Sequence, residues 1–255
     1  MSTDPLMEDY PNWNPYVYCK QNPISRYDPD GNDDIFTSSG RYLKSTKTGN
    51  AVLIQTKTGL RAPSQLSTSR GSRLAMTRVG AYYAGKIAAD SGTMVTTRKG
   101  DMDSDKNPAF TQANTINLNI NGGFSKSLDN INNFKSVMSH ENGHKENNEN
   151  VKFDSNISNH ADVYINQMSD TSFSSTTNDF KLGTASSFAN YLLNMNQSNQ
   201  FGQFDITQKI DVFNSTNQGG MYIQPPMGNF VKGALNLEIQ QNGKTYPVKY
   251  EKVDN

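Results

Sequence analysis

The chain has 255 residues with a formal net charge of +0, and its mean hydropathy is −0.73. A chain of this length can bury a hydrophobic core in one or two domains. The balanced charge argues against bulk electrostatic binding to nucleic acid or an anionic membrane, because such binding needs a clear basic excess. The single cysteine, Cys19, excludes an intramolecular disulfide and any CxxC zinc knuckle.

The sequence shows neither a membrane-spanning segment nor a secretory signal peptide. No apolar run approaches the roughly 18–20 residues that a membrane-spanning helix needs. The N-terminus, Met1 to Pro5, is acidic and has neither the basic nor the apolar region of a secretory signal peptide. We therefore expect no membrane span and no signal peptide in this chain.

The first segment is rich in proline and aromatic residues. Residues 5–31 hold half of the ten prolines, with tyrosines and Trp13 between them. Prolines at this density prevent long helices and favour extended or turn structure. Asp28 to Gly31 is a strong turn signal. We expect this segment to pack against another surface rather than to form a core of its own.

Five short motifs follow one another in this segment: Asp4-Pro5-Leu6, Tyr10-Pro11, Pro15-Tyr16, Asn22-Pro23 and Asp28-Pro29-Asp30-Gly31. In this order and spacing they resemble the end of the Rhs repeat-associated core. The resemblance covers residues 3–31 and departs at Asn14, where Ser is common. In that family this closing segment is followed by a variable C-terminal toxin domain. The resemblance implies delivery as part of a larger exported protein, and a cognate immunity protein as partner.

The next elements alternate between strand and helix signals. Apolar clusters between turn residues at 34–36, 40–43 and 52–56 predict a short β-hairpin region. Residues 62–75 read as a polar linker. From about residue 74 to residue 90, apolar residues at helical spacing predict a helix. Residues 98–112 are polar and read as a loop.

The second half continues this mixed pattern. Strict alternation of apolar residues and Asn over 115–121 predicts a half-buried strand at the edge of a sheet. Helical spacing from about 128 leads into residues 140–144, and further helices are expected at 158–168 and 185–195. The tail from 221 reads as strands, with Asn242-Gly243 as a hairpin turn.

The clearest chemical signal is the HExxH run from His140 to His144. On a helix, residues four apart share a face, so His140 and His144 present two imidazoles to one point. Glu141 lies on the same turn, where it could take a proton from a zinc-bound water. The alternative reading is a solvated helix face that carries two neutral histidines and binds nothing.

His160 is the favoured third zinc ligand. A zinc peptidase needs three protein ligands and one open position, and a helix–loop–helix of this length can return the chain to the metal. The stretch also resembles the second metal helix of many zincins. Ala161-Asp162 matches that pattern, but no glutamate precedes it. Asp162 is the alternative ligand; if His160 binds the metal, Asp162 would instead orient an imidazole.

Two weaker features fit a peptidase. The strand at 115–121 could bind substrate backbone by strand addition, or could be an ordinary core strand. Tyr164 could stabilise a developing oxyanion, although a core role is favoured by its spacing from Asp162.

Together these patterns predict an α+β fold. Residues 1–60 would form the tail of an Rhs-type core with a β-hairpin, and residues 61–255 a zincin-like metallopeptidase toxin domain. Zn²⁺ would be held by His140, His144 and His160, with Glu141 as general base and a protein or peptide as substrate. Two alternatives stay open: a binding module with structural or no zinc, and a zinc hydrolase of non-peptide amides.

Overall fold

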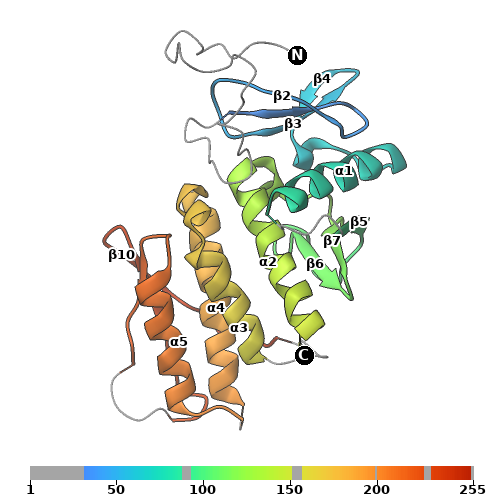
Figure 1. The fold of residues 1–255 in the computed structure, drawn as a ribbon. Coiled ribbons are helices and arrows are strands. Elements are labelled where there is room, and N and C mark those ends of the chain that lie inside the picture. Colours follow the sequence, from blue (N-terminus) through green and yellow to red (C-terminus); the bar gives the residue numbers. More distant parts are fainter. Residues whose placement is uncertain (1–31, 88–92, 151–156, 199, 227–230, 254–255) are drawn as a thin grey trace, which may run out of the picture.

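The computed structural model describes residues 32–87, 93–150, 157–198, 200–226 and 231–253 (Figure 1). The segment that resembles the Rhs core, with Cys19, lies outside the described residues. The described part of the chain contains three β-sheets and five α-helices, which confirms the predicted α+β class. None of the helices described has the length and apolar character needed to cross a membrane.

The first sheet packs on the first helix. Its order is β2-β1-β3-β4, with the predicted hairpin formed by β1 and β2, whereas β3 pairs with β1 in parallel. Phe36, Val52 and Ile54 are buried in the same core cluster as residues of the first helix. The predicted domain boundary after residue 60 falls within β4 and stays a prediction. The strands are β1 (Asp34–Phe36), β2 (Tyr42–Ser45), β3 (Val52–Thr56) and β4 (Gly59–Arg61).

The first helix begins earlier than predicted. A 3-10 turn at Pro63–Gln65 is followed by α1 (Arg70–Ile87). The prediction of a linker over residues 62–75 was therefore wrong for residues 70–75, which are helical. The hydroxyl of Ser69 accepts a hydrogen bond from the main-chain N–H of Ser72 at 3.4 Å, as serine commonly does where a helix begins. The serine residues that suggested a linker thus include one, Ser69, at the start of a helix.

The central sheet corrects two predictions. Its strands are β5 (Met94–Arg98), β6 (Ala109–Gln112) and β7 (Thr115–Asn119), in the order β5-β7-β6. The predicted edge strand, β7, is therefore the middle strand, and the end of the predicted loop at 98–112 is the edge strand β6. The side chain of Asn119 is fully buried and donates to the main-chain oxygens of Met102 and Asn107, so this polar residue is accommodated in the interior.

The helices of the second half lie side by side, with the central sheet on the other side of α2 (Figure 1). The predicted helices at 158–168 and 185–195 are confirmed with longer bounds, and a further helix, α5, was not predicted. The helix predicted from about residue 128 begins at residue 131, after a 3-10 turn. α3 packs against α2, α4 and α5. The elements are η4 (Lys126–Asp129), α2 (Ile131–Asn150), α3 (Ile157–Ser169), η5 (Thr171–Ser175), α4 (Asn178–Gln197) and α5 (Gln203–Thr216).

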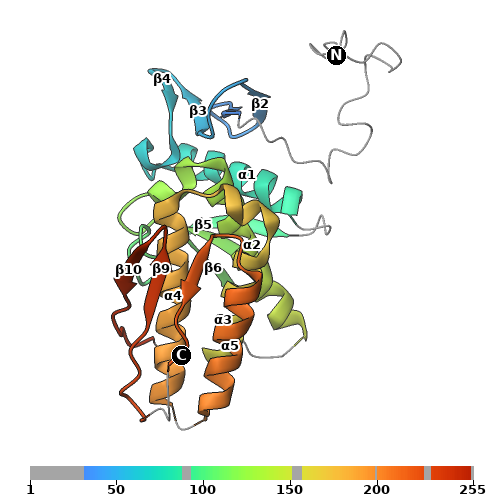
Figure 2. The same cartoon turned by 90° about the vertical axis from the view of Figure 1, so that its left-hand side faces the viewer.

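The C-terminal sheet is an antiparallel meander beside the helices (Figure 2). It consists of β8 (Met221–Ile223), β9 (Glu238–Gln241) and β10 (Lys244–Pro247). The predicted turn is confirmed: Asn242 and Gly243 have φ angles of 51° and 73°, the left-handed conformation that tight hairpin turns require.

Two hydrophobic cores meet at the contact between α2 and α3. Phe134, Val137 and Met138 of α2 belong to a core that includes the first sheet, α1 and the central sheet. Ile165 and Met168 of α3 belong to a second core with α4, α5 and the C-terminal sheet. The apolar face of α2 therefore lies in one core and that of α3 in the other. The two helices contact each other through different faces.

Candidate metal centre

Polar side chains follow one face of each helix where α2 meets α3. On α2 they are Ser136, His140 and His144, each four residues from the next, and on α3 they are His160, Tyr164 and Gln167. Residues at such spacings lie on one helical face. Gln167 contacts Ser136, and the His160 ring lies beside the His144 ring, so the two helices run antiparallel.

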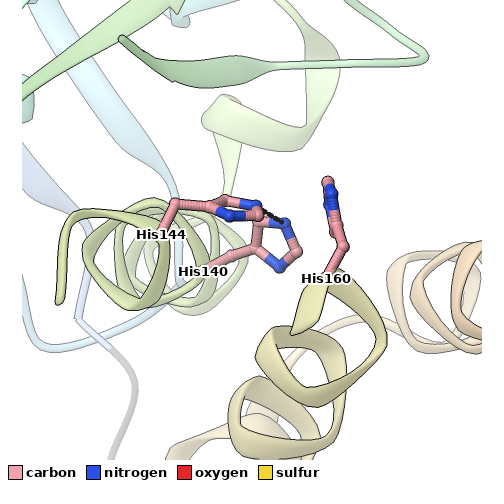
Figure 3. A group of neighbouring side chains, drawn as sticks. All are labelled: His140, His144 and His160. Carbon is pink, nitrogen blue, oxygen red and sulfur yellow. Dashed lines mark hydrogen bonds between the residues drawn. The ribbon is translucent and has the colours of Figure 1, made fainter. Parts of the chain in front are cut away.

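The three histidines converge on one point (Figure 3). One nitrogen from each of His140, His144 and His160 lies within 4.8 Å of the others. The Nε2 atoms of His140 and His144 are 3.1 Å apart. Zinc binds imidazole nitrogen at about 2.0–2.1 Å in tetrahedral geometry, which separates two ligand atoms by about 3.3 Å. The separation of the His140 and His144 nitrogens therefore fits a shared zinc ion, and the structure brings every histidine of the chain into one group that could hold a metal.

The environment of the histidines favours the neutral imidazole that a metal requires. Burial lowers the pKa of His140 well below its usual value, and the neighbouring His144 and His160 lower it further. Burial and the nearby His144 also lower the pKa of His160 to about 3. At neutral pH both side chains keep a nitrogen lone pair.

Glu141 is buried beside the histidines and is held by the central sheet. The side chain is 4% exposed. The hydroxyl of Thr111, on edge strand β6, donates to both the carboxylate Oε2 and the main-chain oxygen of Glu141, each at 2.9 Å. The sheet thus fixes the orientation of the carboxylate that the sequence marks as general base.

Aromatic rings from α3 and α4 surround His160. The ring of Tyr191, on α4, stacks on His160 with centroids 4.2 Å apart, and Tyr164 lies 4.4 Å from the His140 ring. Burial raises the pKa of Tyr164 to about 12, while a hydrogen bond with the Ser187 side chain acts in the opposite direction. Tyr164 therefore carries its proton at neutral pH and can donate a hydrogen bond beside the three histidines.

The other candidate ligand points elsewhere. Asp162 is exposed and forms an ion pair with Lys209 of α5. The potential metal-binding group in the described residues contains His140, His144 and His160 without Asp162. An imidazole is instead oriented by Gln167, whose Oε1 is 3.0 Å from the Nδ1 of His140.

Three residues near the histidines were missed from the sequence. Gln167 follows His160 by seven residues, a helical spacing that could have identified it as sharing the face of the ligand. Thr111 and Tyr191 reach the site from β6 and α4, which are distant in sequence, so no local pattern could have indicated them.

Comparison with known proteins identifies a protein family. The sequence model of a family described as metallopeptidase toxin 2 matches residues 34–223, more than half of the chain. Neither the curated proteins nor the solved structures contain a match. The matched range includes all three histidines and Glu141.

Proposed function

The chain belongs to the metallopeptidase toxin 2 family, and on this premise we propose that it is a zinc-dependent peptidase whose metal is held by His140, His144 and His160. The convergence of three imidazole nitrogens within 4.8 Å carries the proposal. Three neutral nitrogen ligands from two helices are typical of a catalytic zinc site, because they leave one coordination position open.

Each residue has a distinct role in peptide hydrolysis. His140, His144 and His160 would hold a zinc ion, whose Lewis acidity would polarise the substrate carbonyl and lower the pKa of the attacking water. Glu141 accepts the proton of that water and passes it to the nitrogen of the leaving amine. Thr111 holds the carboxylate for this transfer through its hydrogen bond to Oε2. Asp162, paired with Lys209, is left outside the proposed ligand set.

We also propose a role as the C-terminal effector of a larger exported protein of the Rhs type. Two observations support it: the family is one of toxins, and residues 3–31 resemble the end of an Rhs core. The protein or peptide substrate would be met in a target cell or outside the producing cell. A cognate immunity protein would protect the producing cell.

The first test is the zinc content of the purified chain by mass spectrometry. We expect about one zinc per wild-type chain, and none in the His140→Ala/His144→Ala double variant, because two of the three ligands are gone. His160→Ala should lose zinc, whereas the matched Asp162→Ala should keep it. No zinc in the wild type after reconstitution would favour the binding-module alternative.

The second part of the test separates zinc binding from catalysis. Glu141→Gln should keep zinc and the fold but lose peptidase activity in a screen of protein substrates, because the amide cannot accept the proton. A fully active variant would disprove the role of Glu141 as general base. Zinc binding without cleavage of any protein would favour a non-peptide amide as substrate.

A further inference from the structure

The carboxamide of Gln167 joins α3 to α2 in the interior of the protein. Gln167 is 5% exposed, and its partners His140 and Ser136 are 8% and 3% exposed. Its Oε1 lies 3.0 Å from the Nδ1 of His140. Its Nε2 donates to the main-chain oxygen of Ser136 at 3.2 Å and to the Ser136 hydroxyl at 3.0 Å. Both ends of the amide are thus engaged with one helix.

The partners of Gln167 determine which way its amide points. A main-chain carbonyl oxygen can only accept, so the group that faces the carbonyl of Ser136 must be the NH₂. The carbonyl oxygen of Gln167 must then face His140. That oxygen can only accept, so the Nδ1 of His140 must carry the proton.

The protonation of Nδ1 determines the chemistry of the other ring nitrogen. In a neutral imidazole with its proton on Nδ1, Nε2 has a free lone pair. This Nε2 lies 3.1 Å from the Nε2 of His144, on the side where the three histidines converge. In the hydrogen bond between the two histidines, His140 is therefore the acceptor, and the lone pair used there is the one that a metal ion would bind.

We propose that Gln167 is a positioning residue of the metal site, which holds His140 in the tautomer and ring orientation that present Nε2 to zinc. The inference rests on the zinc site proposed above. Ser136 contributes by fixing the orientation of the carboxamide. A single helix, α3, would then supply both a ligand, His160, and the residue that orients a ligand on α2. Residues in this position change metal affinity without touching the metal.

Zinc affinity, measured by competition with a chromophoric chelator, tests the inference in the full chain. Gln167→Met removes the hydrogen bond to His140 and should weaken zinc binding by about 10- to 100-fold, the range typical for partners of ligand histidines. Zinc at saturation should still reach one per chain. Gln208→Met, the same change at an exposed position of α5, should leave the affinity unchanged. Equal affinities for wild type and Gln167→Met would overturn the inference.

A second variant separates positioning from packing. In Gln167→Glu the carboxylate can still accept from Nδ1 of His140, although it can no longer donate to Ser136. Its zinc affinity should therefore be closer to that of the wild type than to that of Gln167→Met. Thermal unfolding of the zinc-free variants would show that each is folded at the assay temperature. An affinity as low in Gln167→Glu as in Gln167→Met would assign Gln167 a packing role only.

The tautomer can be measured without zinc or substrate. Long-range proton–nitrogen correlation spectra of the zinc-free chain, which has three histidines, should show His140 protonated on Nδ1. This preference should be lost in Gln167→Met and kept in Gln208→Met. Protonation on Nε2 in the wild type would overturn the inference. A wild-type chain that binds no zinc would instead defeat the proposed function, whatever the tautomer.

Discussion

The orientation of Glu141 depends on a residue from another part of the fold. A buried carboxylate has to be hydrogen-bonded, and here the hydroxyl of Thr111, thirty positions earlier in the sequence, donates to it. A hydrogen bond to a charged group is worth about 1.5–3 kcal/mol. Thr111 therefore contributes to the proposed proton transfer through the position of Glu141.

Replacement of Thr111 should affect catalysis more than metal binding. In Thr111→Val the shape is kept and the donor is lost, so kcat should fall by about 10- to 100-fold, the factor equivalent to one charged hydrogen bond. Zinc content should not change. Thr111→Ser, which keeps the hydroxyl, should stay near wild type, as should Thr245→Val at an exposed position of β10. Steady-state kinetics with a cleaved substrate would measure this, and an unchanged kcat in Thr111→Val would contradict it.

The buried histidines should make the zinc-free protein less stable in acid. The pKa of His160 is lowered to about 3 in the folded chain, against about 6.5 when unfolded. Between these values the unfolded chain binds a proton that the folded chain does not. Stability should therefore be lost as the pH falls below about 6.5, and the loss should continue towards pH 3. Urea denaturation of the zinc-free chain from pH 7 to pH 4 would show it.

The variant His160→Asn provides the control for this pH dependence. It removes one of the groups whose protonation is suppressed by folding, so its stability should fall less steeply over the same pH range. A wild-type curve that is flat, or that rises as the pH falls, would contradict the expected sign.

At the scale of elements, the close approach of α2 and α3 places the histidines. Gly143, within the HExxH run, lies against Val163 of α3: a Cβ at this position would be 3.1 Å from Val163 Cγ1. The absence of a side chain lets the two helices come close, so that His160 can reach His140 and His144. Each helix also has an apolar face, which is anchored in one of the two cores.

The first sheet is tied to α1 by a buried hydrogen bond. The hydroxyl of Tyr83 donates to Oδ2 of Asp34 on β1 at 2.8 Å, and Ser45 donates to the other carboxylate oxygen. Burial and the charge of Asp34 raise the pKa of Tyr83 well above its usual value, so the phenol stays a donor. This contact holds the sheet on the helix that covers the central sheet.

Removal of that hydroxyl should weaken the attachment. Tyr83→Phe leaves a buried carboxylate oxygen without its phenol partner, which should lower the free energy of unfolding by about 1–3 kcal/mol. Tyr222→Phe, at a side chain that is 40% exposed, should cost far less. Urea denaturation would compare the two variants, and equal stabilities would show that the buried bond contributes nothing net.

At the scale of the whole molecule, the first sheet shares a core with α2, the helix that carries His140 and His144. Phe36, Val52 and Ile54 lie in the same cluster as Phe134 and Met138 of α2. The family match also begins at residue 34, within β1. We therefore expect residues 34–60 to support the fold of the peptidase region physically, whatever their evolutionary origin.

Truncation tests the role of the first sheet. A chain that starts at residue 32 should fold and bind zinc as the full chain does. A chain that starts at residue 62 loses three large side chains that are each at most 2% exposed, and should be strongly destabilised. Thermal unfolding and zinc content of both chains would measure this. A stable, zinc-binding chain from residue 62 would support the predicted boundary after residue 60.

Local patterns determined much of this protein. The HExxH spacing on an apolar helical pattern identified α2 and its two histidines, because i and i+4 share a helical face. Asn242-Gly243 identified the hairpin turn, because its backbone needs left-handed residues. The α+β class followed from the alternation of strand and helix signals. Each of these signals depends on residues that are near one another in sequence.

Only the tertiary structure decided the rest. β7 looked like an edge strand because of its asparagines, yet it is the middle strand of its sheet. The amide of Asn119 is satisfied by loop carbonyls, and that of Asn117 by main-chain oxygens of β6 and β7. Asp162 and His160 were both open as third ligand, and the packing of α3 turned His160 towards α2 and Asp162 towards Lys209. Thr111 and Tyr191 reach the site through contacts between elements that are distant in sequence. Such contacts depend on how helices and sheets pack against one another, and a local sequence pattern does not determine that packing.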